Sequence, residues 1–435
     1  MPMFNYFLNI SYLFGMDMFS YLMFMLGLWI ISLVYLASIN MNMNYMIYFN
    51  ILMFIFILIF FFCFFSSSYI MFYIFYEVNL IPVLILIYGW GYQYERFKAG
   101  FYLFIYMIFF SLPFFSCLLY LSKTNFMYMY YFDYYYNLNF FFFFFLMMIF
   151  LVKMPLFMFH IWLPSAHVEA PIFFFFFFLM MIFLVKMPLF MFHIWLPSAH
   201  VEAPISGSMI LAGIMLKLGG FGIYHILMLI FKSNLVYNFY FISLSLFGMF
   251  ILSLVCFFQS DLKILIAYSS VVHMGLVIIG FLTFSKWGYC GSLILMFGHG
   301  LCSSGLFCLS NICYLRFKSR SMFLNKGLIN IFPFLSFWWF LLCSSNMSFP
   351  PSLNLFGELM LLLNLMIWLD SLFIFYFLLM VLMFLYSLYL YLYTQYNKFY
   401  YNLNYLVYIS LSEYLLLFLH WIPLNLMFLL MEFFI

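Results

Sequence analysis

Long apolar stretches alternate with short polar segments along almost the whole chain. A helix needs about 20 apolar residues to cross a bilayer, and inside lipid an α-helix satisfies its own backbone polar groups. The pattern therefore predicts an all-α, polytopic membrane helix bundle that forms a single domain over residues 1–435. The predicted crossings are Met18–Ser38, Tyr45–Phe65, Ser68–Trp90, Phe101–Leu121, Phe140–Leu163, Phe173–Leu196, Ala203–Ile230, Tyr237–Phe258, Leu262–Phe281, Tyr289–Leu315, Ile331–Leu369, Ser371–Tyr393 and Tyr405–Leu430.

One of these stretches, Ile331–Leu369, is too long for one plain helix. It contains Pro350 and Pro351, and a proline removes a backbone hydrogen bond and clashes with the preceding turn. We therefore predict one crossing that is broken at this pair. A second kind of break is predicted where Pro155 and Pro188 follow a lysine in "KMP".

Composition supports the membrane class, because hydrophobic residues make up 70% of the chain and charged residues only 6%. Soluble domains carry about 25% charged residues. The net charge of +3 is too small to indicate a nucleic-acid partner. Eight cysteines lie mostly in apolar stretches without a C-x-x-C pair, so we interpret them as small buried residues rather than metal or iron–sulfur ligands. The excess of Phe, Tyr and Met is typical of an A/T-rich mitochondrial genome, with selection for packing as the alternative.

A few charged residues lie inside the predicted crossings. Glu77 and Lys217 are near the middle of theirs, and Glu358 follows the proline break. Lys153 and Lys186 occupy equivalent mid-crossing positions. A charge at this depth costs about 3 kcal/mol, so such groups persist where they pair, line a wet cavity or carry ions. We predict a row of acid and base groups at one depth that transfers protons laterally; structural ion pairs and snorkelling side chains remain the alternatives.

Two histidines are further relay candidates, since a neutral imidazole accepts and donates protons near physiological pH. His299 lies in "FGHGLCSSG", whose small residues we expect to leave room for water, and His273 follows a pair of serines. A helix–helix hydrogen bond is the alternative for each. The remaining histidines of interest are expected in loops or at helix ends rather than around a metal: His160, His167, His193 and His200.

Residues 140–172 are repeated without one substitution as residues 173–205. If both copies cross the membrane, every later helix is inverted relative to Glu77. One crossing places seven loop Lys and Arg on one side and three on the other, whereas two crossings give four against six. The positive-inside rule favours one crossing. We interpret the repeat as a recent duplication or a sequence-assembly error, with a tolerated insertion as the alternative.

Position must decide between the identical copies. The second copy leads through the short loop Pro197–Glu202 into the Lys217 helix. We therefore predict that Lys186, rather than Lys153, faces Glu77, and that the first copy is displaced.

Five ordered segments point to a known family: "YEVNLIPVLILIYGWGYQYERFKAG", "LVKMPLFMFHIWLPSAHVEAPISGSMILAGIMLKLGGFG", "QSDLKILIAYSSVVHMG", "GHGLCSSGLFCL" and "PPSLNLFGELM". From about Asp17 to the C-terminus, the chain resembles the chain-four family of mitochondrial NADH–ubiquinone oxidoreductase. Members of this family are antiporter-like, proton-pumping subunits of respiratory complex I.

The resemblance implies an antiporter-like bundle of about 14 helices, two of them broken and related by inverted symmetry. The chain begins about two helices short of that pattern, so we expect about 12 crossings plus one duplicated segment. The resemblance also implies that NADH, flavin, iron–sulfur clusters and quinone belong to other subunits, with no cofactor in this chain. The implied partners are other membrane-arm subunits and lipid, and the implied location is the mitochondrial inner membrane. The implied proton-relay residues are Glu77, Lys153 or Lys186, Lys217, His299 and Glu358.

Two other functional classes remain open at this point. A stand-alone cation/proton antiporter subunit shares the same motifs. A purely structural membrane scaffold would use the buried charges only as packing pairs.

Overall fold

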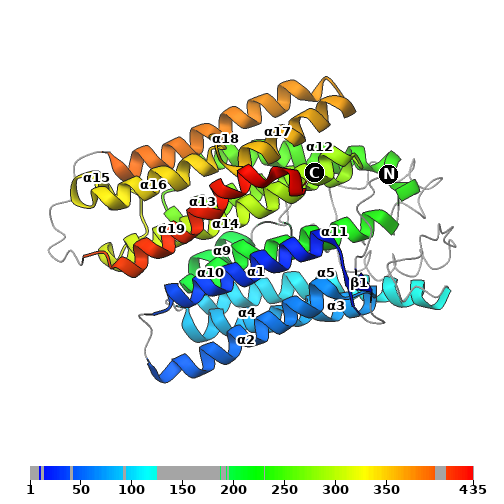
Figure 1. The fold of residues 1–435 in the computed structure, drawn as a ribbon, viewed down its shortest axis with the longest axis horizontal. Coiled ribbons are helices and arrows are strands. Elements are labelled where there is room, and N and C mark those ends of the chain that lie inside the picture. The colour runs from blue at the N-terminus through cyan, green and yellow to red at the C-terminus, as the bar shows by residue number, and fades with distance from the viewer. Residues whose placement is uncertain are drawn as a thin grey trace.

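The computed structural model describes residues 9–10, 14–39, 43–91, 95–124, 187, 193, 195–229, 231–396 and 408–434. In this part of the chain the helices lie side by side in one bundle, with a minimal antiparallel strand pair, β1 and β2, at one end (Figure 1). The elements before the repeat are β1 (Asn9–Ile10), β2 (Gly15–Met16), α1 (Met18–Ala37), α2 (Met43–Phe65), α3 (Tyr69–Val78), α4 (Leu80–Trp90) and α5 (Arg96–Thr124).

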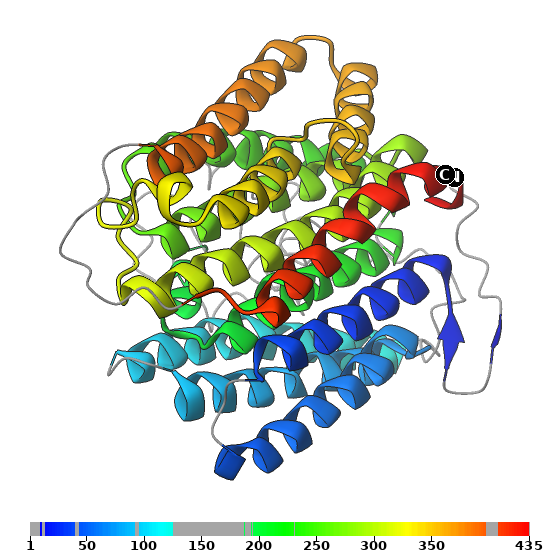
Figure 2. The same cartoon turned by 60° about the vertical axis from the view of Figure 1, so that its left-hand side comes forward.

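The helices after the repeat continue the bundle, and those near the C-terminus cover one side of it (Figure 2). Their bounds are α9 (Trp195–Glu202), α10 (Ile205–Ile210), the π-helix η1 (Leu211–Met215), α11 (Leu216–Leu229), α12 (Phe231–Phe257), α13 (Leu262–Leu282), α14 (Lys286–Phe317), α15 (Leu328–Ile331), α16 (Pro333–Asn346), α17 (Leu353–Trp368), α18 (Leu372–Gln395), α19 (Leu411–Leu426) and the 3-10 helix η2 (Met427–Phe434).

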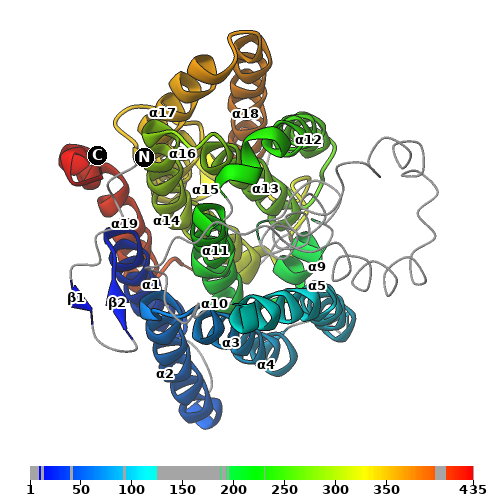
Figure 3. The ribbon, with the colours of Figure 1, turned by 90° about the vertical axis from the view of Figure 1, so that its right-hand side faces the viewer.

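Burial separates central from peripheral helices. Seen end-on, α11, α13 and α14 occupy the middle, whereas α2 and α18 lie at the outside (Figure 3). In the most apolar 18-residue stretch of α14, 100% of the residues are buried inside the protein. The corresponding share is 44% in α2 and 28% in α18. Large apolar side chains such as Ile374 and Phe375 are exposed on α18. An apolar outer surface of this kind suits lipid, while the central helices are enclosed by protein.

Most of the predicted crossings coincide with observed helices in the described part of the chain, whereas Met187 and His193 of the predicted crossing Phe173–Leu196 are not helical. Eight segments of the described part are long and apolar enough to cross a bilayer, and α17 and the apolar part of α12 are shorter. Most ends fall within a few residues of the prediction. One connection was predicted incorrectly: Pro197–Glu202 is not a loop but forms most of α9.

The break at the proline pair is confirmed, because α16 ends at Asn346 and α17 begins at Leu353. Two further irregularities were not predicted. The crossing that carries Glu77 is interrupted at Asn79, which separates α3 from α4. Pro82, three residues further on, has no N–H to donate to the carbonyl of Val78.

The other unpredicted irregularity is η1, one turn of π-helix between α10 and α11. A π turn inserts one extra residue into the helix and often lies at a functional site. It directly precedes Lys217, so it rotates the first turn of α11 relative to α10.

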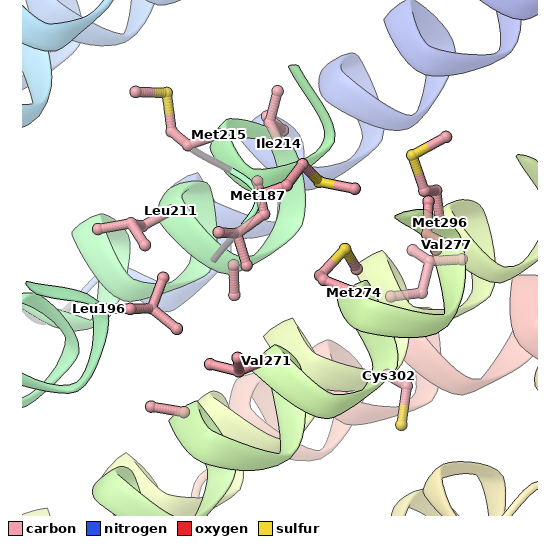
Figure 4. Close-up of a cluster of buried hydrophobic side chains, with 14 of the residues drawn as sticks. Met187, Leu196, Leu211, Ile214, Met215, Val271, Met274, Val277, Met296 and Cys302 are labelled. Carbon is pink, nitrogen blue, oxygen red and sulfur yellow. The ribbon is translucent and has the colours of Figure 1, made fainter. Parts of the chain in front are cut away.

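Both repeat lysines, Lys153 and Lys186, lie outside the described residues, as does the whole of the first copy. From the second copy, Met187 is described and wholly buried. Its side chain lies among Leu211, Ile214 and other apolar residues of η1 and α13 (Figure 4). Which lysine faces Glu77 stays a prediction.

The two ends of the bundle can be identified from basic side chains. Arg96 donates a hydrogen bond to the Gly91 carbonyl, and a Cβ added at Gly91 would lie 3.0 Å from the carbonyl oxygen of Glu202. Arg320 donates to the carbonyl of Val201, the preceding residue. Arg96 and Arg320 therefore lie at the same end of the bundle, which is the arrangement that the single-crossing count predicts.

Candidate functional site

Lys217 lies in the first turn of α11 and its side chain is 0% exposed. Its Nζ donates a hydrogen bond to the Ala212 carbonyl, which belongs to the π turn. Among the described residues, no carboxylate lies within ion-pair distance of Lys217. A lysine in this setting has a backbone carbonyl to stabilise its ammonium but no full counter-charge.

The second polar neighbour of Lys217 is His299 in the middle of α14, with Nζ and Nδ1 3.1 Å apart. Two glycines flank the histidine and allow this approach. A Cβ at Gly300 would lie 3.4 Å from Lys217 Cε, and a Cβ at Gly298 would lie only 2.3 Å from Asn354 Oδ1. These glycines let α11 and α17 lie close to α14, so side chains of the neighbouring helices fill the space beside the two glycines. Water elsewhere around His299 stays a prediction.

The row continues from α14 to α13 and α17. The imidazole rings of His299 and His273 have centroids 5.4 Å apart. His273 Nδ1 lies 3.4 Å from Glu358 Oε1, a long approach for a hydrogen bond. Both members of this last pair are 1% exposed. Four helices thus bring together Lys217, His299, His273 and Glu358 in the protein interior.

Two tyrosines of α18 complete the far end of the row. Tyr386 places its hydroxyl 3.3 Å from His273 Nε2, and Tyr376 donates a hydrogen bond of 2.9 Å to the backbone carbonyl of Glu358. Both rings are fully buried, although most of α18 faces outward.

The break between α16 and α17 positions Glu358 against α14. Asn354, in the first turn of α17, donates to the Ser345 carbonyl at the end of α16 over 2.9 Å. Cys302 of α14 lies 3.3 Å from the Ser345 hydroxyl, Sγ to Oγ. A Cβ at Gly357 would lie 3.1 Å from that of Leu295, so only a glycine lets α17 approach α14 this closely.

A different kind of buried charge joins α14 to α19. Arg316 contacts both carboxylate oxygens of Glu413, and also donates to the carbonyls of Ile312 and Tyr408. Arg316 is 4% and Glu413 16% exposed. This is a forked arginine–carboxylate pair in which each charge has a full partner.

At the same end as Arg320 lies a third group of polar side chains. Lys263 is buried rather than exposed at its helix start, and its Nζ donates to the Ala203 carbonyl over 3.3 Å. Burial raises the pKa of Glu202, which the nearby Arg320 guanidinium partly offsets. His200, in the last turn of α9, is wholly buried and stacks on Phe307 with centroids 4.4 Å apart.

Of the predicted relay residues, the structure brings three into one row: Lys217, His299 and Glu358. His273, the further candidate, connects two of them. Glu77 lies at the end of α3 beside the Asn79 interruption, but its predicted lysine partner is outside the described residues. Sequence reasoning did not single out Lys263 or Tyr386. Tyrosine is too frequent in this chain for one to stand out, and a lysine at a helix start is usually solvated.

Comparison with protein families gives two matching models. Residues 66–178 and 172–383 match "NADH:quinone oxidoreductase/Mrp antiporter, TM", and residues 1–66 match "NADH-ubiquinone oxidoreductase chain 4, amino terminus". The two segments that match the first model meet at the start of the second repeat copy.

Relatives and solved structures agree with these matches. The chain is 46% identical to NADH-ubiquinone oxidoreductase chain 4 of Ceratitis capitata, over 97% of this chain and 88% of that protein. It is 47% identical to the protein of the same name from Locusta migratoria, over 98% and 89%. In fold it is similar to a chain of respiratory complex I from Thermus thermophilus with bound NADH (TM-score 0.80, 22% identity, covering 97% of this chain and 83% of that one). A chain of the Mrp complex from Dietzia is also similar (TM-score 0.74, 15% identity, 88% and 67%).

Proposed function

The chain belongs to the family of NADH-ubiquinone oxidoreductase chain 4, and we propose that its buried row from Lys217 to Glu358 carries protons during turnover. It is a proton-pumping subunit of the membrane arm of respiratory complex I. Proton pumping requires side chains that bind and release protons inside the membrane.

One observation supports the proposal above the others: among the described residues, a wholly buried lysine faces a histidine instead of a carboxylate. A permanently charged Lys217 at this depth would carry a large desolvation penalty without a counter-ion to offset it. A lysine that gains and loses a proton avoids that penalty for part of the cycle. His299 is suited to exchange that proton, because a neutral imidazole nitrogen can accept one.

Each contact of the row permits a simple step. Lys217 Nζ and His299 Nδ1 are within hydrogen-bonding distance, so one hydrogen can lie between them. The ring spacing of 5.4 Å leaves the next transfer, to His273, to a bridging water or a ring movement.

The last step is between His273 and Glu358. Their nearest atoms, Nδ1 and Oε1, are 3.4 Å apart, and the pair is either neutral or an imidazolium facing a carboxylate. The row therefore accommodates one mobile proton between two resting places, Lys217 at one end and Glu358 at the other.

Neighbouring charges couple the two ends. An ammonium at Lys217 disfavours a second positive charge on His299, whereas a carboxylate at Glu358 favours a charged His273. A change of charge at one end thus shifts where the proton resides along the row. A change of charge that other subunits cause at one end of the row would therefore move a proton along it.

Glu77 belongs to the same proposal as the acid on the other side of the bundle. We expect it to pair with a lysine of the repeat, Lys186 rather than Lys153, because either ion alone is costly in lipid. The separation between that Nζ and the Glu77 carboxylate in a determined structure of the assembled complex tests this part.

The remaining features of the proposal concern the surroundings of the chain. We propose that it carries out no redox chemistry and binds no cofactor, and that NADH, flavin, iron–sulfur clusters and quinone are held by other subunits. The other membrane-arm subunits and lipid are its partners, in the mitochondrial inner membrane. The chain itself is multi-pass, with eight candidate spans among its described residues.

A cation/proton antiporter subunit is the weaker alternative. The likeness to the Mrp complex chain is one of fold, at 15% identity, whereas the relatives from Ceratitis capitata and Locusta migratoria, at 46% and 47% identity, are named NADH-ubiquinone oxidoreductase chain 4. If pumping by the assembled complex is unchanged when Na⁺ is replaced by K⁺, the antiporter reading loses its basis.

Lys217→Ala tests the proposed function in the assembled complex. The variant should assemble normally, while the number of protons translocated per NADH oxidised in sealed vesicles falls. Lys326→Ala is the matched control, since Lys326 lies over the rings of Phe323 and Tyr393 away from the row. Wild-type pumping by Lys217→Ala would overturn the role of the row, and loss of assembly in that variant alone would favour a structural scaffold.

A further inference from the structure

His273 is the member of the row whose two ring nitrogens have different partners. Nδ1 faces Glu358 of α17, and Nε2 faces the Tyr386 hydroxyl of α18. His299 lies against the ring rather than at either nitrogen, with an angle of 36° between the two ring planes. A neutral imidazole carries one hydrogen, so its partners decide which nitrogen holds it.

The Tyr386 hydroxyl favours one of the two tautomers. If it donates to Nε2, the imidazole hydrogen is on Nδ1, the nitrogen that lies 3.4 Å from Glu358 Oε1 without a hydrogen bond of its own within the described part of the chain. If Nε2 carries the hydrogen instead, the phenol proton of Tyr386 loses its acceptor among the described residues. A buried hydroxyl without an acceptor is costly, so the first arrangement is the more stable.

From this geometry we propose that Tyr386 is a positioning residue that holds neutral His273 in the tautomer with its hydrogen on Nδ1, directed at Glu358. This inference rests on the proposed function of the row. Its consequence is directional: a proton that reaches His273 from the His299 side adds at Nε2, where the hydroxyl turns from donor to acceptor, and the imidazolium then passes its Nδ1 proton to Glu358. One proton enters the imidazole at Nε2, one leaves it at Nδ1, and the Glu358 carboxylate gains the proton that leaves.

The other tyrosine of α18 offers a matched control. Tyr376 is buried like Tyr386 and bonds to the same glutamate, but through the backbone carbonyl, and it does not touch His273. Tyr376→Phe also removes one buried hydrogen bond beside Glu358. It leaves the contact between Tyr386 and His273 intact, so the tautomer of the imidazole should not change. A purely structural role would make the two Tyr→Phe variants behave alike.

The test measures proton pumping by assembled complex in vesicles as a function of pH. In Tyr386→Phe the preference for one tautomer, about five- to tenfold for one net hydrogen bond, is lost and both tautomers of His273 become populated. The productive fraction then falls to about one half, so pumping should fall about twofold at alkaline pH. The defect should shrink toward acidic pH, because an imidazolium carries hydrogen on both nitrogens and no tautomer has to be selected. The titratable groups around the imidazole are Glu358 of α17, His299 and Cys302 of α14, Cys256 of α12 and Tyr386 itself.

Tyr376→Phe should show no such pH-dependent defect. A Tyr386→Phe variant that pumps normally at every pH, or whose loss is independent of pH and equal to that of Tyr376→Phe, would overturn the inference. Lys217→Ala measured in the same vesicles keeps the two proposals apart. If Lys217→Ala loses pumping while Tyr386→Phe does not, the row carries protons and only the role of Tyr386 is wrong.

Discussion

Glu358 is buried and Glu413 partly buried, and the two glutamates have different partners. Glu413 receives a forked arginine, Arg316, which is also held by the carbonyls of Ile312 and Tyr408. Glu358 has only His273 near its carboxylate, at 3.4 Å, among the described residues. The first acid has an arginine as counter-charge, whereas the second faces a side chain that can be neutral or charged.

The difference teaches how to separate structural from proton-carrying charges in such a bundle. Arginine stays protonated at all relevant pH values, so the Arg316–Glu413 pair is fixed and can only join α14 to α19. A histidine ring can be neutral or charged, so its pair with Glu358 permits the proton exchange that we propose. The same distinction applies to Lys217, whose nearest side-chain partner is a histidine.

The largest expected effect on stability comes from breaking the fixed pair. Arg316→Ala leaves Glu413 partly buried without a counter-charge and should destabilise the assembled complex by roughly 3 kcal/mol. Thermal denaturation of the purified complex measures the loss. Pumping per assembled complex should stay normal, and replacing both partners by Arg316→Met with Glu413→Leu should recover much of the stability. A pumping defect in the assembled Arg316→Ala complex would break the comparison.

A smaller effect is expected where the row is held together by close helix packing. In Gly298→Ala the new methyl would meet the Asn354 side chain, forcing α14 and α17 apart at a cost of about 1–3 kcal/mol. Because this moves Glu358 relative to His273, proton pumping should fall more than assembly does. Gly89→Ala is the control, since a Cβ at Gly89 meets nothing within 4 Å. Equal behaviour of the two variants would show that the spacing of α14 and α17 is unimportant.

Much of the helical bundle could be predicted from the sequence, because a bilayer imposes a simple rule on length and polarity. The same rule identified Lys217 and Glu358, since a charge in an apolar stretch is conspicuous. The broken helix could be predicted from Pro350 and Pro351, whose missing N–H groups act locally.

What could not be predicted depends on contacts between distant segments. The π turn before Lys217 contains no proline or other residue from which it could be predicted. The pair of Arg316 and Glu413 joins residues that are 97 positions apart in the sequence. The glycines around His299 were predicted to admit water, but other helices fill the space beside them. Small residues in a sequence do not reveal whether water or a neighbouring backbone occupies the room they leave.

The most direct measurement makes the same change at the two contrasted acids and counts protons. Glu358→Gln and Glu413→Gln are nearly isosteric, and each removes one buried carboxylate from the assembled complex. We predict that Glu358→Gln lowers the number of protons translocated per NADH oxidised, while Glu413→Gln leaves that number unchanged and lowers only the melting temperature. Full proton stoichiometry in Glu358→Gln, or an equal loss in both variants, would contradict the account.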